Sequence, residues 1–196
     1  MQELSDYSKI PFLEQVFKKN QGNEHYPVIN ILARKCRKVA QLGVSKDKYL
    51  SFLFAQSGID ELYTVDKDPH FLESSAYMNL RNICNKNNIL FNHIKEDTRV
   101  ADLPDVDLIY TNTECTSHHI KCELLSYSDR VKKYIIISNT DIYREVSDHG
   151  YNLNGIHYKY PGLGVGIQEF LSLCSNWRIL YEFRHDGGLS ILERKS

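Results

Sequence analysis

The chain has 196 residues, of which 42% are hydrophobic and 25% charged, and its formal net charge is −1. This composition is typical of a globular protein, and the near-neutral charge gives no electrostatic basis for binding nucleic acid. No stretch has the length and apolar character of a membrane span, and the first residues lack the basic and apolar regions of a signal peptide. We therefore expect one cytoplasmic domain without nucleic-acid or membrane partners.

The N-terminal part of the chain predicts two helices before the first strand. Apolar residues recur at helical spacing over 8–19 and again over 25–38. The apolar run over 38–44 predicts a strand, which passes through Gly43 into a helix over 46–58. A strand that turns tightly at a glycine into a helix is typical of nucleotide-binding folds.

The turn after this first strand keeps only part of the glycine pattern of a dinucleotide site. Gly43 follows the apolar residues Val39, Ala40 and Leu42, but Lys46 stands where the second glycine is expected and no third follows. Three interpretations stay open: a cofactor site, a cofactor site in decay, and an ordinary strand-to-helix turn.

Strands and helices continue to alternate through the middle of the chain. They are expected at 61–69 (strand), 69–87 (helix), 88–97 and 106–114 (strands), 116–133 (helix) and 134–140 (strand). This alternation predicts right-handed crossovers and a buried, mainly parallel sheet. The five cysteines are scattered and include no CxxC pair, so we expect reduced, mostly buried thiols rather than zinc or disulfides.

The pattern changes after the fifth strand. Residues 141–164 are expected to form a long loop, and loops of this length in compact domains are usually functional or mobile. A helix over 165–176 then leads to two strand-like runs within 177–194, separated by the letters HDGG, which predict a hairpin. The predicted fold class is α/β, with a Rossmann-like, seven-stranded, mostly parallel sheet, helices on both faces and a C-terminal antiparallel hairpin.

Acidic residues follow two of the predicted strands. Ligands of open α/β sheets bind beyond the carboxyl ends of the strands, near the point where the strand order reverses. Asp66 ends the second strand, where a carboxylate can accept both hydroxyl donors of a ribose, and Asp97 follows the third strand, where it can accept from an adenine amino group. A solvated acidic turn is the alternative at each position.

Three segments carry a resemblance to a known family. They read NEHYPVINILARKCRKVAQLGV (23–44), DLIYTNTECTSHHIKCELLSYSDRVKKYIIISNT (107–140) and GVGIQEFLSLCSNWRILYEFRHDGGLSILER (164–194). They resemble the opening helix and first strand, the segment from strand four to strand five, and the closing helix and hairpin of class I S-adenosylmethionine-dependent methyltransferases. The most similar branch is a small one from bacteria, phages and giant viruses, related to cephalosporin-hydroxylase-like proteins.

The resemblance implies one methyltransferase-like domain over 1–196 that binds S-adenosylmethionine, in the host cytoplasm if the source is a virus. Its parts would be N-terminal helices (1–36), a cofactor-binding half (37–140), a substrate loop (141–162), and a closing helix and hairpin (163–196). The implied cofactor-binding residues are Gly43, Val44, Ser45, Asp66, Asp97 and Asn112.

Several polar positions depart from the pattern of this branch. Gln41 stands where relatives have an acid before the first glycine, and Lys46 stands where they have the second glycine. Asn112 replaces the acid of strand four, and Cys115 and Ser117 replace the histidine and tyrosine that follow it. Ser138-Asn139 replaces the His-Asp pair after strand five. Relatives that use a divalent metal hold it on carboxylates from strands four and five. The neutral asparagines predict that no metal binds here, and Lys46 would either cap the cofactor carboxylate or occupy its space.

Two main hypotheses about function follow. The first is metal-independent O-methylation of a sugar or another small hydroxylated acceptor, with His118, His119 and Glu114 as catalytic candidates beyond strand four. A solvated helix start is the alternative for at least one of the histidines. Aromatic and histidine side chains in the expected loop suit a sugar, but also a loop that packs down (Tyr143, His149, Tyr151, His157, Tyr158 and Tyr160).

The second hypothesis is a catalytically inactive, methyltransferase-like binding or scaffolding protein, because so many polar positions have changed. A nicotinamide enzyme is a third candidate, which the single-glycine turn and the terminal hairpin disfavour. Each of these hypotheses leaves open whether the protein forms a homo-oligomer.

Overall fold

The computed structural model describes residues 24–44 and 48–195. The helix expected over 8–19, and the residues Ser45 and Lys46, lie outside this part of the chain. Among the described residues, no helix combines the length and the apolar character that crossing a bilayer would require.

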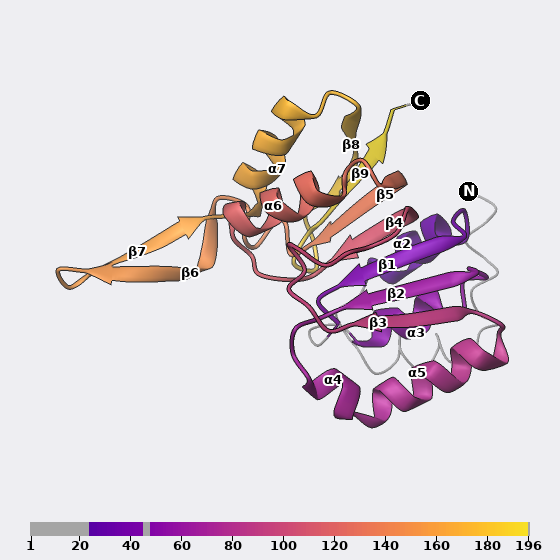
Figure 1. Cartoon of the computed structure of the whole chain (residues 1–196). Coiled ribbons are helices and arrows are strands. Elements are labelled where there is room, and N and C mark those ends of the chain that lie inside the picture. The colour runs from indigo at the N-terminus through magenta and orange to yellow at the C-terminus, as the bar shows by residue number, and fades with distance from the viewer. Residues whose placement is uncertain (1–23, 45–47, 196) are drawn as a thin grey trace.

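A seven-stranded sheet forms the centre of the molecule, in the order β3-β2-β1-β4-β5-β9-β8 (Figure 1). The first five strands are parallel: β1 (Lys38–Leu42), β2 (Glu61–Val65), β3 (Leu90–Ile94), β4 (Val106–Thr111) and β5 (Val131–Ser138). The last two form the hairpin of β8 (Trp177–Phe183) and β9 (Leu189–Arg194), and β9 runs antiparallel to both of its neighbours. The predicted fold class and the antiparallel last strand are confirmed.

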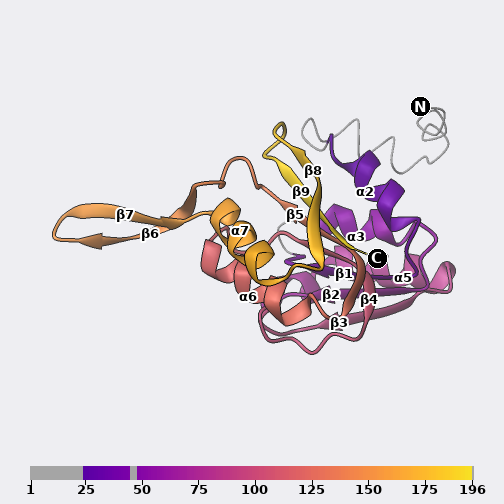
Figure 2. The same ribbon diagram turned by 90° about the horizontal axis from the view of Figure 1, so that it is seen from above.

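Helices cover both faces of this sheet, as Figure 2 shows from above. One face packs against α2 (Tyr26–Ala33), α3 (Lys48–Phe54) and α5 (Ser75–Lys86), and the other against α6 (Ser117–Tyr127) and α7 (Leu163–Leu173). Each face has its own cluster of buried aliphatic and aromatic side chains. The central strands β1 and β4 are therefore buried on both faces, which explains their mostly apolar sequences, whereas the edge strand β3 has no fully buried residue.

The helix expected over 69–87 is two helices. The short α4 (His70–Glu73) ends at Ser74, whose extended backbone (φ −85°, ψ 151°) breaks the helical path. The Ser74 side chain accepts a hydrogen bond from the backbone N–H of Tyr77 and so caps α5. A serine that satisfies a free N–H in this way favours a new helix start over continuation of the old one.

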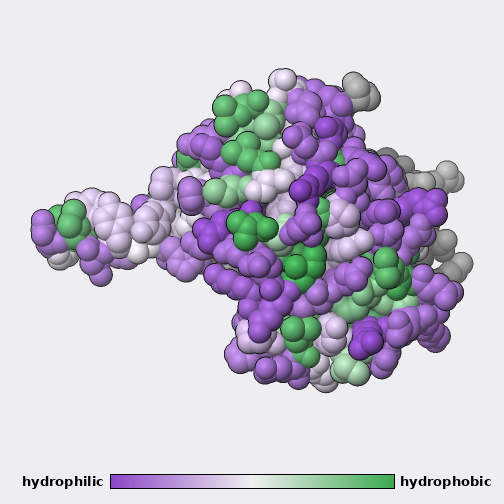
Figure 3. All heavy atoms as spheres, in the orientation of Figure 1, coloured by the Kyte–Doolittle hydropathy of each residue, from purple (hydrophilic) through white to green (hydrophobic). Residues whose placement is uncertain are grey.

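The prediction of a long loop over 141–164 is wrong for most of this segment. β6 (Val146–Leu153) and β7 (Ile156–Pro161) form a separate two-stranded antiparallel sheet, which projects from the body of the protein (Figures 1 and 3). The turn is Asn154-Gly155, and both residues have positive φ (52° and 80°), as a tight hairpin requires. We call residues 146–161 the arm.

The arm does not pack down onto the sheet. Every described side chain of β7 is exposed, and Leu153 and Ile156 beside the turn are more than half exposed. Tyr151 stacks on its cross-strand partner Tyr158, with ring centroids 5.4 Å apart. Such aromatic cross-strand pairs stabilise a hairpin that has little other support.

Candidate functional site

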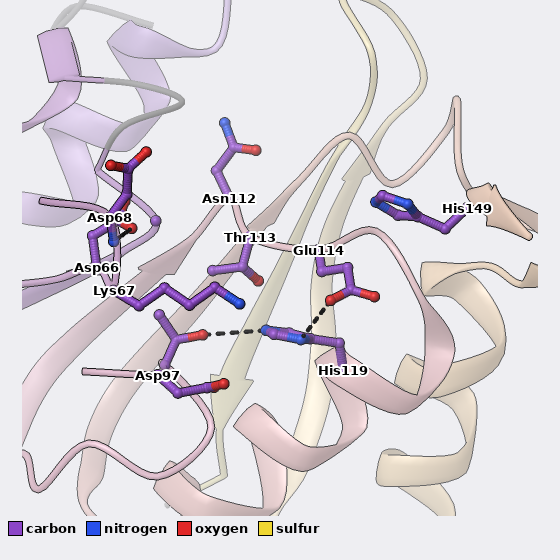
Figure 4. A pocket seen from close by; sticks show the side chains of 11 residues that line it. Asp66, Lys67, Asp68, Asp97, Asn112, Thr113, Glu114, His119 and His149 are labelled. Atoms are coloured by element: carbon purple, nitrogen blue, oxygen red, sulfur yellow. Dashed lines mark hydrogen bonds and ion pairs between the residues drawn. The ribbon is translucent and has the colours of Figure 1, made fainter. Parts of the chain in front are cut away.

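Four parallel strands end at one pocket of about 340 Å³, at the edge of the sheet where the strand order reverses between β1 and β4 (Figure 4). Seven of the residues singled out from the sequence line it: Gly43, Asp66, Asp97, Asn112, Glu114, His119 and His149. The remaining lining residues are Lys67, Asp68, Thr98 and Thr113. The volume lies within the range of roughly 300–1,000 Å³ that is usual for small-molecule sites.

Gly43 is required by the geometry of the pocket floor. Its φ is +80°, and a Cβ at this position would lie 2.2 Å from the backbone oxygen of Asn112. Any other residue would have to adopt a left-handed backbone and push the end of β4 away. Two positions earlier, Gln41 is fully buried and accepts a hydrogen bond from the Ser51 hydroxyl (2.6 Å), which ties β1 to α3.

Asp66 is held at the end of β2 by its own turn. Its Oδ1 accepts a hydrogen bond from the backbone N–H of Asp68 (2.9 Å), and the residue is only 9% exposed. Figure 4 shows Asp66 and Asp68 on one side of the pocket, with the Lys67 side chain extending across it. The turn therefore fixes a carboxylate at the position where the sequence predicted one for a ribose.

Asp97 is engaged by a neighbouring arginine. The Arg99 guanidinium donates to both carboxylate oxygens, at 2.9 and 2.6 Å. This pairing holds the pKa of the Asp97 carboxyl far below its usual range and raises the pKa of Arg99. Asp97 is therefore a carboxylate of fixed orientation at neutral pH.

His119 is positioned by the start of α6. Thr116 caps the helix and accepts a hydrogen bond from the backbone N–H of His119, which places the imidazole in the first turn. His119 Nε2 lies 2.9 Å from Oε1 of Glu123, one helical turn further on. On the other side of the ring, Nδ1 lies 3.4 Å from Oε2 of Glu114. The imidazole is thus held between two carboxyl groups.

Glu123 is the buried anchor of this arrangement. It is 2% exposed, and its carboxylate also accepts hydrogen bonds from the hydroxyls of Thr98 and Thr111. A buried carboxylate that orients a histidine fixes which ring nitrogen carries the proton. Glu123 was not predicted from the sequence, although its position four residues after His119 on a predicted helix places the two side chains on the same helix face.

Three residues that the sequence predicted for the site are not among those that line the pocket. His118 points away from the pocket: it is exposed, and its Nε2 lies 3.7 Å from Sγ of Cys122. The side chain of Val44 is buried in the core cluster that includes α2 and α3. Ser45 lies outside the described residues.

The two asparagines that replace the metal-binding carboxylates of relatives do come together. Asn139 follows β5 with a positive φ of 61°, and its Nδ2 donates to Oδ1 of Asn112 (3.1 Å). Each neutral amide therefore has a partner in the other. Within residues 24–44 and 48–195, no group of three histidine, cysteine or carboxylate side chains is arranged to hold a metal ion.

No protein-family model and no curated protein matches the sequence. Solved structures do match the fold. The O-methyltransferase TomG from Streptomyces achromogenes, involved in tomaymycin synthesis and solved with S-adenosylmethionine, superposes with a TM-score of 0.60 at 14% identity, over 87% of this chain and 79% of TomG.

Two further structures agree. A Staphylococcus aureus protein assigned as a caffeoyl-CoA O-methyltransferase gives a TM-score of 0.62 at 16% identity, over 95% of this chain and 92% of the other. The Podospora anserina methyltransferase PaMTH1, bound to S-adenosylhomocysteine, gives 0.57 at 12% identity, over 96% of this chain and 84% of the other. At these identities the likeness concerns the fold: the chain has the fold of class I S-adenosylmethionine-dependent methyltransferases.

Proposed function

We propose that the protein is an S-adenosylmethionine-dependent methyltransferase and that its cofactor binds in the pocket at the ends of β1 to β4. The observation that carries this proposal is the convergence of Gly43, Asp66 and Asp97, from three successive strand ends, on one pocket. Gly43 lets the ends of β1 and β4 lie close together at the floor of the pocket, and the two carboxylates can accept from hydroxyl and amino donors. When bound, the cofactor supplies an electrophilic methyl group.

Four residues that line the pocket have a proposed part in holding the cofactor. The Asp66 carboxylate accepts both ribose hydroxyls, and Asp97 accepts from the adenine amino group. The backbone of Gly43 and Val44, together with Asn112, binds the amino-acid part, and the same part is proposed for Ser45, which lies outside the described residues. The structures of TomG and PaMTH1, solved with S-adenosylmethionine and S-adenosylhomocysteine, support this choice of cofactor.

For the acceptor we propose a small hydroxylated molecule that is methylated on oxygen. Transfer requires the acceptor oxygen in line with the methyl group and a side chain that takes its proton. His119 is the proposed proton acceptor, with Glu114 beside it and Glu123 as the residue that positions its ring. His118 is a weaker candidate because it is exposed and does not line the pocket.

A sugar acceptor rests on narrower support. Among the six aromatic and histidine residues that suggested a sugar, only His149 lines the pocket, while the tyrosines of the arm are exposed. We further propose that transfer needs no metal, because Asn112 and Asn139 bring no charge and their amides bond to each other. The same pairing favours the alternative of an inactive binding protein, since it replaces acids that relatives are expected to carry.

Calorimetric titration with S-adenosylmethionine and S-adenosylhomocysteine tests the cofactor. Replacing Asp66 with alanine should weaken binding by roughly 1–3 kcal/mol, or about 5- to 150-fold, because it leaves hydroxyl donors unpaired. Asp102→Ala is a matched control, since Asp102 is an exposed acid whose partner is Arg130 on the surface. Absence of binding at millimolar cofactor would overturn the proposal.

Methyl transfer to a panel of phenols, catechols and sugars in excess chelator separates the enzyme from the inactive alternative. Turnover that persists in chelator and is lost in His119→Asn supports the mechanism. Cofactor binding without turnover on any acceptor favours the binding protein. Activity that chelator abolishes and magnesium or manganese restores would refute metal independence and would point to Glu114 and the two asparagine carbonyls as ligands.

A further inference from the structure

A second cavity of about 220 Å³ lies at the same end of the sheet, beside the turn of the C-terminal hairpin. Its walls include His25 and Tyr26 at the start of α2, Tyr110 on β4, and Ser138 and Asn139 at the end of β5. Asn112 lines both this cavity and the cofactor pocket, so the two spaces adjoin. We call this space the hairpin cavity.

His25 presents a defined tautomer to its surroundings. The residue is 6% exposed, and its Nε2 lies 3.0 Å from the backbone carbonyl of His185. A carbonyl can only accept, so Nε2 carries a hydrogen. Burial lowers the pKa of His25, while the His185 carbonyl and Asp186 oppose this shift. The ring is therefore neutral near pH 7, and its Nδ1 is a bare acceptor.

Two residues that line the hairpin cavity each carry a buried polar atom without a hydrogen-bond partner among the described residues. Nδ1 of His25 and the hydroxyl of Ser138 are both buried and unpaired within the described part of the chain. Buried polar groups in native proteins are nearly always hydrogen-bonded, and an exception calls for a missing water, ion or ligand. Two exceptions around one cavity point to a ligand that supplies a donor.

The lining also limits what this ligand is. Tyr26, Ile29 and Tyr110 are almost fully buried and contribute two aromatic side chains and one aliphatic side chain to a lining that is otherwise mostly polar. The carboxylate of Asp186, which accepts from the backbone N–H of Glu24, stands at the exposed side and disfavours an anion. The volume is below the roughly 300 Å³ at which pockets for drug-sized molecules begin, so it suits one ring.

We propose that the hairpin cavity binds the ring of the methyl acceptor, a neutral ring that donates a hydroxyl hydrogen to Nδ1 of His25 and bonds to Ser138. The assignment of this ring to the acceptor rests on the proposed function, because an acceptor must adjoin the cofactor. Binding of a ring alcohol in the cavity does not need the cofactor and can be measured alone. A phenol and a sugar ring share this chemistry.

Fragment binding followed by NMR of ¹⁵N-labelled histidine side chains tests the proposal. Phenol and methyl glucoside are the two probes, and the one that shifts the Nδ1 resonance of His25 identifies the kind of ring. Anisole has the ring of phenol without the hydroxyl hydrogen, so it should bind about ten-fold more weakly than phenol, or not at all. If neither phenol nor methyl glucoside perturbs His25, the proposal is overturned.

Two substitutions of His25 separate its nitrogens. His25→Gln places an amide N–H near the position of Nε2 and can keep the bond to His185, but it has no acceptor at the position of Nδ1. His25→Asn does the reverse. The probe that binds should lose about ten-fold or more in affinity in His25→Gln and less in His25→Asn. The control is His157→Gln on the exposed arm, which should bind like the wild type.

If the His25 variants fail to fold, Ser138→Ala serves instead, and it should weaken binding of the same probe severalfold. Equal probe affinity in His25→Gln, or in Ser138→Ala, overturns the proposal. Cofactor titration of the same samples distinguishes the two levels of inference. Cofactor binding without ring-alcohol binding refutes only the proposal for the hairpin cavity. Ring-alcohol binding at His25 without cofactor binding refutes only the proposal that the protein is a methyltransferase.

Discussion

Replacing Glu123 with leucine should lower the free energy of unfolding by about 2–4 kcal/mol. The carboxylate is 2% exposed and accepts three hydrogen bonds, from Thr98, Thr111 and His119. Leucine fills a similar volume but accepts none of them. The perturbation therefore removes the partner of several buried donors at once without opening a large cavity.

The magnitude follows from how many donors remain unpaired. The Thr111 hydroxyl can turn toward Thr113 Oγ1, 3.3 Å away, so it finds a second partner. The Nε2–H of His119 can donate to Thr98 Oγ1, 3.2 Å away, but the Thr98 hydroxyl hydrogen then has no acceptor, at about 1–3 kcal/mol. Both replacement bonds are also longer than the bonds to the carboxylate that they replace, which adds to the loss. Removing the desolvation cost of a buried carboxylate offsets part of this sum. Glu123→Gln keeps one oxygen for Thr98 and His119, so it should cost only about 1–2 kcal/mol.

Urea unfolding followed by tryptophan fluorescence measures these changes. The chain has one tryptophan, Trp177, which is 2% exposed and packs against Phe170. Glu169→Gln is the matched control, because Glu169 is an exposed helical acid paired with Lys121, and such surface pairs contribute about 0–1 kcal/mol. Wild-type stability in Glu123→Leu would show that the buried network does not support the fold.

Three further changes have definite expected outcomes. Gly43→Ala should unfold at lower urea concentration and lose cofactor affinity, because its Cβ meets the Asn112 carbonyl at a positive φ; unchanged titration and unfolding curves would contradict this. Burial lowers the pKa of both His25 and His93 below 6.5, so the unfolded chain binds more protons. The stability that these neutral rings contribute is complete above about pH 6.5 and is lost as the pH falls toward their lowered pKa values. The urea midpoint of unfolding should therefore drop between pH 7.5 and 5.5, and a rise of the midpoint over this range would refute the expected direction. Burial raises the pKa of Cys36 to about 12, so mass spectrometry after brief alkylation should find Cys122 modified and Cys36 intact unless urea is present.

The sequence by itself determined the sheet and one side of the site. Apolar runs that alternate with helical periodicity predict parallel strands, and the letters HDGG predict the closing hairpin, because these signals are local. Gly43 and Asp66 were found in the same way, since each follows directly on a strand. The arm was also within reach of the sequence, because Asn154-Gly155 between alternating residues is a strong hairpin signal that the loop interpretation overlooked.

Only the tertiary structure decided which side chains meet. His118 and His119 are neighbours in sequence, but successive residues on a helix point about 100° apart, and the packing of α6 on the sheet turns His119 toward Glu114 and leaves His118 in solvent. His25 reaches the carbonyl of His185 across 160 residues of chain, and Asn139 reaches Asn112 across a strand pair. No local pattern encodes these contacts, because they depend on how separate elements pack against one another.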